Sequence, residues 1–296
     1  MSFCVIGIGE VLWDVFPTHR RLGGAPYNYA FHCRQMSADA AIASCVGRDD
    51  PGFEIQQCAE ESGLDVSCLQ EVSGAPTGTV QVRLESGKPS YEICPDAAWD
   101  HLAFTAELSH LTARADAICF GTLGQRNRQS REVIGTAVRN CPETALKIFD
   151  VNLRQEFFSK EVIQDSLQLA NILKVSDEEL PVLKTMFGLT GEVPDQLRQL
   201  IDRFSFRLAA YTRGPNGSLL VLADTLSDHG GCEGAAVDSV GAGDAFTAAL
   251  CMGLLQEWSL DEINEYSNRV ATFVCSQKGA TPILPSELIQ GVPSYA

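Results

Sequence analysis

Short apolar runs alternate along this chain with longer segments in which apolar residues recur at helical spacing. The apolar runs are rich in Val, Ile, Phe and Ala, and they cover residues 3–8, 40–46, 115–121, 145–151, 171–175 and 208–212. The segments with helical spacing include residues 130–139, 161–169 and 194–204. Because continuous apolar runs are typical of strands buried on both faces, the pattern predicts βαβ units and a largely parallel sheet with helices on both sides.

Two stretches depart from this pattern and predict antiparallel ribbons. Residues 77–83 alternate with period two, Ser-Gly-Lys-Pro at 86–89 is typical of a turn, and residues 90–94 supply a second strand. Residues 11–16 and 18–22 predict another pair of strands. We therefore expect one α/β domain over residues 1–296, in which residues of about 10–26 and 76–96 form a small β-sheet lid over the main sheet.

The excess of acidic over basic side chains limits the kinds of molecule that this protein is expected to bind. Of the 296 residues, 45% are hydrophobic, so a sizeable core can form, and 22 basic against 38 acidic side chains give a net charge of −16. This balance argues against generic binding to nucleic acid or to an anionic membrane, since both need clustered Lys and Arg. The N-terminus lacks a signal-peptide pattern, and no run approaches the roughly 18 apolar residues of a membrane span. We expect a soluble, cytoplasmic protein.

The chain has eleven cysteines, and no two are closer than ten residues. This spacing excludes a Cys-x-x-Cys motif and a zinc-knuckle pattern. Most of the cysteines lie in apolar runs, which predicts buried free thiols in a reducing compartment.

The most informative segment for chemistry is Gly241-Ala242-Gly243-Asp244, which precedes an apolar helical run at 245–255. The glycines predict a loop at a helix N-terminus, where free N–H groups and the helix dipole suit an anion. The alternative is a tight turn followed by an ordinary first-turn acid. An acid beside an anion site repels phosphate, so Asp244 is better explained as a base that takes a proton from an attacking hydroxyl. No Walker loop and no three-glycine dinucleotide fingerprint is present.

The segment Asp-Ser-Val-Gly-Ala-Gly-Asp-Ala-Phe at 238–246 resembles the C-terminal signature of the ribokinase-like (PfkB) sugar kinases. Further motifs similar to those of this family occur in family order along nearly the whole chain, at 9–17, 23–28, 46–50, 149–154, 212–217, 268–271 and 277–282. Residues 9–14, 98–100 and 150–154 resemble the fructokinase branch in particular. The resemblance implies a ribokinase-like three-layer fold with a mostly parallel sheet and a lid.

The resemblance also implies roles for individual residues. Asp244 would be the catalytic base, and Gly241, Ala242 and Gly243 would offer N–H groups to the transferring phosphoryl. The sugar would be bound by Asp14, Gly23, Gly24, Asn28, Asn152 and Arg154. The alternatives are a solvated Asp14 in a hairpin turn and an Arg154 that is only a surface cation. On the predicted hairpin, Tyr91 and Ile93 face one way, and we expect that face to close over the sugar and exclude water.

For the nucleotide, the resemblance implies a phosphate-facing turn and an adenine pocket, formed by Thr212, Arg213, Gly214, Gly217, Asn268, Ala271 and Gly279. Ordinary helix packing is the alternative for Ala271. Magnesium is expected to arrive with ATP. Its family element, Asn-x-x-Glu, is here Ser176-Asp177-Glu178-Glu179, so Glu179 would act through metal-bound water, or else close a helix-capping box. Asp238 and Ala280 match the family's site for a monovalent cation such as potassium.

These features predict an ATP-dependent sugar kinase, with fructose converted to fructose 6-phosphate as the first hypothesis. Other sugars (ribose, 2-keto-3-deoxygluconate) or nucleosides are alternative substrates. A silent sugar or nucleotide sensor on the same fold is disfavoured because it needs no base, and a Rossmann-type dehydrogenase because the fingerprint is missing. Tyr27 stands where the fructokinase branch often has alanine, so Tyr27 and Tyr29 either reshape the sugar pocket or pack the lid. Exposed lid edges predict a homodimer.

Overall fold

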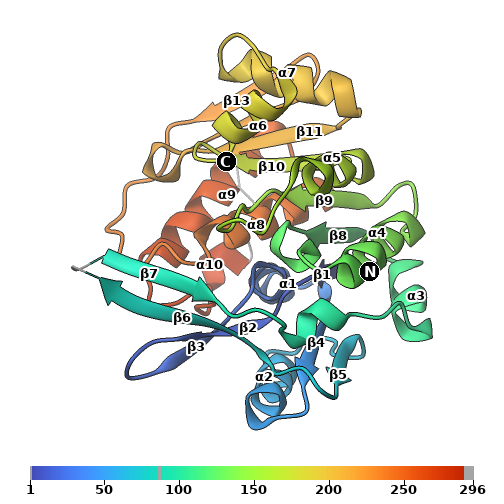
Figure 1. Ribbon diagram of the computed structural model, residues 1–296. Coiled ribbons are helices and arrows are strands. Elements are labelled where there is room, and N and C mark those ends of the chain that lie inside the picture. Colours follow the sequence, from blue (N-terminus) through green and yellow to red (C-terminus); the bar gives the residue numbers. More distant parts are fainter. Residues whose placement is uncertain (1, 86–87, 290–296) are drawn as a thin grey trace.

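The computed structural model describes residues 2–85 and 88–289, and the side chains of the same residues except 83–91 (Figure 1). Within this part of the chain, nine strands form one large sheet in the order β13-β12-β11-β10-β9-β8-β1-β4-β5. The strands are β1 (Cys4–Ile8), β4 (Asp39–Gly47), β5 (Leu69–Val72), β8 (Ala117–Phe120), β9 (Leu146–Asp150), β10 (Ile172–Ser176), β11 (Leu208–Thr212), β12 (Ser218–Val221) and β13 (Leu226–His229). The pairs from β5 to β11 are parallel, and β12 and β13 add an antiparallel edge.

Helices cover both faces of the large sheet, as Figure 1 shows. The described helices are α1 (Ala25–Gln35), α2 (Asp50–Glu61), α3 (Ala106–Thr112), α4 (Arg128–Asn140), α5 (Lys160–Leu169), α6 (Leu180–Phe187), α7 (Val193–Phe204), α8 (Ala242–Leu255), α9 (Leu260–Cys275) and α10 (Ser286–Ile289). Alternate strand residues point to opposite faces: Ile6 and Ile8 pack with α3 to α7, whereas Val5 packs with α1, α2 and α8 to α10. Two apolar cores therefore sandwich one sheet, as the apolar runs predict.

A second, four-stranded sheet projects from this body in the order β3-β2-β6-β7 (Figure 1). Its strands are β2 (Leu12–Val15), β3 (Arg20–Gly23), β6 (Gly78–Glu85) and β7 (Lys88–Ile93). We call it the small sheet. Its strands fall within the two segments predicted for a lid. The predicted turn at 86–89 is wrong in extent, because Lys88 and Pro89 pair with Glu85 and Leu84 inside the hairpin.

Three contacts fix the base of the small sheet. A Cβ at Gly78 would lie 1.7 Å from the Trp99 ring, so only glycine lets the indole pack against β6. The guanidinium of Arg126 stacks on Trp99, with its Cζ 4.6 Å from the ring centroid, and Nη2 donates to the buried Asp100 at 2.7 Å. Asp49, which caps α2, accepts the Thr77 N–H at 2.9 Å. The small sheet therefore leaves the body from a rigid base.

All six apolar runs are strands, and the three segments with helical spacing are α4, α5 and α7. The three short strands β5, β12 and β13 were not predicted, since four residues give little periodic signal. All eleven cysteines are free thiols and seven are buried, which confirms that part of the prediction. Among the described residues, no helix is long and apolar enough to cross a membrane.

Candidate active site

The predicted site residues gather at the carboxyl edge of the large sheet. Strand β9 ends at Asp150, β10 at Ser176 and β11 at Thr212, and these parallel strands are neighbours. Helix α8 begins beside them, because Thr247 on its second turn donates to the Asp150 carboxylate at 2.9 Å. Open α/β sheets bind ligands at this edge, where the loops after the strands converge.

Helix α8 begins at Ala242, with Gly241 as its N-cap in the left-handed region at a φ of 78°. A Cβ at Gly241 would lie 2.5 Å from the Cβ of Ala280, so the chain needs glycine here. Ala242 and Gly243 thus belong to the first helical turn, which corrects the predicted loop. The N–H groups of a first turn lack partners within the helix, so they remain suited to an anion.

Asp244 lies in this first turn and is partly accessible. Its Oδ2 accepts a hydrogen bond of 2.8 Å from Nδ2 of the buried Asn28 on α1. Burial, and then the nearby charge of Asp150, raise the pKa of Asp244 to about 6, against the opposing effects of Asn28 and two cations. The carboxylate is therefore ionised at neutral pH and is still basic enough to accept a proton.

A buried pair that the sequence reasoning missed lies beneath Asp244. Nζ of Lys174 donates to the Asp150 carboxylate at 3.0 Å, and both side chains are less than a tenth exposed. Burial alone would lower the pKa of the Lys174 ammonium, but the charges of Asp150, Glu179 and Asp244 raise it. A Cβ at Gly243 would lie 3.2 Å from this ammonium, so a fixed positive charge stands beside the N-terminus of α8. The one sign of this buried pair in the sequence was the position of Lys174 inside the apolar run 171–175.

The side of the site assigned to the sugar contains the Asn28 amide and two carboxylates, Glu10 and Asp14, that lie near the Arg154 cation. Burial raises the pKa of Asp14 to about 6 and that of Glu10 to about 7, while the charge of Arg154 lowers both. Two buried oxygens, Oε2 of Glu10 and Oδ1 of Asn28, have no hydrogen-bond partner among the described residues. Unpartnered buried acceptors of this kind suit the hydroxyls of a polyol. Glu10 belongs to a motif quoted above, but sequence reasoning gave it no role.

The paired glycines allow close packing on this side. A Cβ at Gly23 would lie 2.8 Å from Oδ2 of Asp14, and one at Gly24 would lie 2.5 Å from the backbone oxygen of Glu10. Asn152 adopts a left-handed φ of 44°, and its carbonyl accepts from Thr122 at 3.0 Å. This left-handed residue turns the chain directly after β9, and Arg154, two residues later, is exposed.

The residues of the predicted hairpin face and the two tyrosines of α1 differ in how close they lie to the site. Ile93 is buried in the small apolar cluster with Val80 and Trp99. The side chain of Tyr91 lies outside the described residues. Tyr27 and Tyr29 both pack in the core between α1 and the large sheet, and the Tyr27 hydroxyl lies 3.5 Å from Ser62. Tyr29 in addition lines a cavity of about 10 Å³ together with Asp150, Asn152 and Asp244. Of the two tyrosines, Tyr29 is therefore the one at the site.

Glu179 is buried and bonded through both carboxylate oxygens. Oε1 accepts the N–H of Leu153 at 3.0 Å and Oε2 accepts that of Ser176 at 2.8 Å. Helix α6 starts at Leu180 with Glu179 itself as N-cap. The bond from the Ser176 N–H to the Glu179 carboxylate is nevertheless one of the two bonds of the capping box named as the alternative, so that alternative is borne out in part. No cluster of three or more His, Cys, Asp or Glu side chains suited to a metal occurs among the described residues. Magnesium that arrives on phosphate oxygens would therefore meet Glu179 only through water, because both of its oxygens already accept backbone N–H groups.

The residues predicted to bind the nucleotide lie in three separate segments of the chain, at 212–217, 268–271 and 279. Thr212 ends β11, and the guanidinium of Arg213 donates to the backbone of Ser218 and His229 and to Asp228, which ties it to the β12–β13 hairpin. Gly214 and Gly217 have positive φ, and a Cβ at Gly217 would lie 2.0 Å from the His229 oxygen. Arg213 therefore has a structural role that its motif did not reveal.

On helix α9, Asn268 is buried and donates to Ser218 and to Asn264, which holds the helix against the hairpin. Ala271 is partly exposed less than one turn farther along. Gly279 has a φ of 84°, and its N–H donates to Oδ2 of Asp238 at 3.1 Å. Ala271 and Gly279 are thus partly accessible, whereas the Asn268 amide is already bonded. Ala271 also packs against the core, as the alternative of ordinary helix packing predicts.

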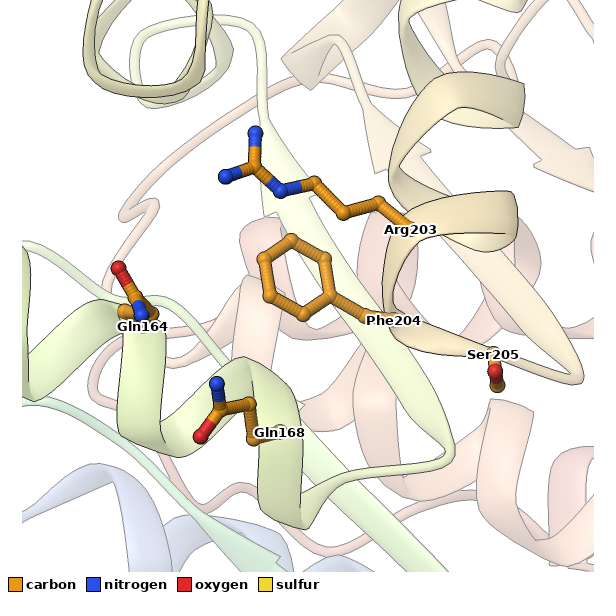
Figure 2. A pocket seen from close by; sticks show the side chains of 5 residues that line it. All are labelled: Gln164, Gln168, Arg203, Phe204 and Ser205. Atoms are coloured by element: carbon orange, nitrogen blue, oxygen red, sulfur yellow. The ribbon is translucent and has the colours of Figure 1, made fainter.

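A larger cavity of about 260 Å³ lies elsewhere, between α5 and α7 (Figure 2). Its lining includes Gln164, Gln168, Arg203, Phe204 and Ser205. Helices α5 and α7 end there, just before β10 and β11 begin, so this cavity lies at the opposite edge of the sheet from Asp244. It takes no part in the site described here.

Comparison with known proteins gives one consistent result. A model of the pfkB family carbohydrate kinases matches residues 8–287. The chain is 26% identical to a fructokinase of Escherichia coli over 310 residues, which cover 96% of this chain and 97% of that one. The structure of an uncharacterized sugar kinase from Pyrococcus horikoshii aligns with a TM-score of 0.82 at 26% identity, over 94% of this chain and 93% of that one.

A fructokinase from Vibrio cholerae O395, solved with fructose, ADP and calcium ion bound, also aligns with a TM-score of 0.82. Its identity to this chain is 25%, over 98% of this chain and 99% of that one. The predicted ribokinase-like α/β fold is confirmed by these and related structures.

Proposed function

The chain belongs to the pfkB family of carbohydrate kinases, and we propose that it transfers the γ-phosphoryl of ATP to the 6-hydroxyl of fructose. One observation carries the proposal. The Asp244 carboxylate, oriented by Asn28, lies in the first turn of α8 beside the Lys174 ammonium. A base and an anion-binding helix end therefore meet at one point, as phosphoryl transfer from ATP to an alcohol requires.

In this mechanism the sugar hydroxyl is held at Asp244. As the oxygen forms its bond to the γ-phosphorus, Asp244 takes the hydroxyl proton, and the bond from phosphorus to the β–γ bridging oxygen breaks to leave ADP. The first-turn N–H groups of α8 and the Lys174 ammonium stabilise the charge on the transferring phosphoryl. Asn28 keeps the carboxylate in place, because its Nδ2 donates to Oδ2 of Asp244.

Magnesium bound to the triphosphate would supply further neutralisation of phosphate charge. Glu179 would orient it through water. Because Glu179 also bonds the N–H groups of Ser176 and Leu153, it holds the end of β10 against the loop that carries Asn152 and Arg154.

The choice of fructose rests on two supports. Fructokinases are among the relatives that align over nearly the whole chain. In addition, the carboxylates of Glu10 and Asp14 and the Oδ1 of Asn28 offer several acceptors to a polyhydroxy substrate. The small sheet would act as a lid over this substrate, and exclusion of water by such a lid protects ATP from hydrolysis.

The test is an ADP-coupled kinase assay over a panel of fructose, ribose, 2-keto-3-deoxygluconate and nucleosides, with magnesium and ATP. We expect fructose to give the highest kcat/KM. A higher value for another sugar would reject fructose and keep the sugar kinase. Phosphorylation of none, with sugar binding still detected by calorimetry, would favour the sensor.

We also propose a homodimer through the edges of the small sheet, which are β3 and β7. Light scattering after size exclusion should then give twice the mass of 32.0 kDa. A monomer at micromolar concentration would reject this assembly.

A further inference from the structure

The resemblance assigned a monovalent-cation site to Asp238 and Ala280, but both are already bonded in this structure. Oδ2 of Asp238 accepts from Nη1 of Arg21 at 2.7 Å and from the N–H of Gly279 at 3.1 Å. Oδ1 of Asp238 accepts the N–H of Val240 at 3.1 Å. The carbonyl of Ala280 accepts from Nε2 of the buried His32 at 2.9 Å. Three N–H groups on Asp238 and one on Ala280 thus already neutralise these oxygens in part, and they leave fewer lone pairs for a cation than an open site offers.

The Arg21 guanidinium adds a second obstacle. It forms an ion pair with Asp238 in which both side chains are at most a third exposed. A Cβ at Gly279 would lie 3.6 Å from Cδ of Arg21, so the arginine side chain passes directly over this glycine. A metal cation at Asp238 would meet this fixed positive charge at short range, and like charges repel most strongly where water is partly excluded.

We propose that Arg21 takes the place of the monovalent cation and makes this kinase independent of potassium. The guanidinium bonds the carboxylate that opens the 238–241 loop, and that loop leads directly into the first turn of α8. Arg21 is thus a positioning residue. It acts through Asp238 on the N–H groups that receive the phosphoryl, and it touches neither sugar nor phosphate in this role.

The position of Arg21 links this loop to the sugar side of the site. Arg21 lies on β3 of the small sheet, directly opposite Asp14 on β2. The ion pair therefore joins the strand pair that carries a predicted sugar ligand to the loop before the anion site, across 217 residues of sequence. A free cation could order the 238–241 loop in any position of the small sheet, whereas Arg21 orders it only when the small sheet is in place.

The test compares the wild type and Arg21→Ala in about 100 mM KCl and in about 100 mM tetramethylammonium chloride, whose cation is too large for a carbonyl-lined site. Thermal unfolding is measured first, because it needs no substrate, and kcat is then measured with the best sugar of the panel. For the wild type we expect melting temperatures within about 1 °C and kcat within about twofold in the two salts. For Arg21→Ala we expect potassium to raise kcat about tenfold and the melting temperature by about 2 °C.

Two variants separate this role from a merely structural one. Arg21→Lys keeps a positive charge near Asp238 and should remain insensitive to potassium. Arg20→Ala is the matched control, because Arg20 lies next in the same strand but pairs with Glu54 and stacks on Trp13 instead. It should respond to the two salts as the wild type does.

The proposal is overturned if potassium raises the kcat or the melting temperature of the wild type. It is equally overturned if Arg21→Ala is as insensitive to potassium as the wild type. The proposed function can fail separately: if no sugar is phosphorylated, the melting temperatures still decide the role of Arg21. If Arg21→Ala does not fold, the wild-type and Arg21→Lys measurements decide it.

Discussion

Replacing Asp244 with asparagine should remove most of the turnover and, at neutral pH, stabilise the fold. Asparagine has nearly the same shape, and its Oδ1 can still accept the hydrogen bond from Asn28. It cannot accept the proton of the sugar hydroxyl. We expect kcat to fall about 10²–10⁴-fold while the sugar and ATP still bind.

The gain in stability follows from the cost of holding a charge at this position. Burial and the charge of Asp150 raise the pKa of Asp244 from 3.8 to about 6. A shift of about two units corresponds to at most about 3 kcal/mol at neutral pH, since part of the carboxylate remains accessible to water. Because the folded pKa lies above the unfolded one, this cost is absent below about pH 4, grows toward pH 6 and is complete above it.

For 296 residues with an unfolding entropy of about 2 cal/mol/K each, 3 kcal/mol corresponds to a rise of about 5 °C in the melting temperature. Kinase turnover and urea unfolding are the assays, the latter at about pH 7.5 and near pH 4, where the variant and the wild type should converge. Asp224→Asn is the control, because Asp224 is exposed on the turn between β12 and β13 and should change neither quantity. Near-normal turnover of Asp244→Asn would refute the assignment of the base. An unfolding free energy that is unchanged or lower at pH 7.5 would refute the reasoning from burial.

Three further outcomes are expected. The kcat/KM of the wild type should fall about tenfold per pH unit below about pH 6, as Asp244 becomes protonated, and a flat pH profile would contradict this. Lys174→Met should lower kcat and cost about 3–5 kcal/mol in urea unfolding, because it leaves the Asp150 carboxylate buried without its cation; a stable variant would count against the pair. Gly78→Ala should lower the melting temperature by several degrees, because the new Cβ would overlap the Trp99 ring; an unchanged value would mean that the indole can move aside.

Most of the large sheet could be predicted from the sequence, because its buried strands follow a repeating local pattern of apolar residues. Each buried run was visible as a continuous apolar stretch, and the alternation of Ile6 and Ile8 with Val5 between the two cores follows from strand geometry alone. The antiparallel hairpin of β12 and β13 was not predicted, and the structural role of Arg213 was missed with it. Its partners Asp228 and His229 lie on that unpredicted hairpin.

The sequence predicted those parts of the site in which all the functional residues are neighbours in the chain, as in residues 241–244. It did not predict contacts between residues that are far apart in the chain. Lys174 interrupts an apolar run and gives no sign of its pairing with Asp150 or of its place beside Gly243. The bond from Thr247 to Asp150 spans 97 residues. Such pairs are set by how strands and helices pack, and no local pattern records them.

The anion site is assembled from the two ends of the polypeptide. Gly241 packs against Ala280, whose carbonyl is held by His32 on the first helix, 248 residues earlier in the chain. Gln35 on that helix bonds the carbonyl of Pro282 at 3.1 Å. During synthesis, these contacts can form only after the last elements of the domain have been made. A nascent chain that ends before residue 280 would therefore hold a complete parallel sheet and still lack the support of its catalytic turn, so activity should appear only when the C-terminal segment joins the first helix.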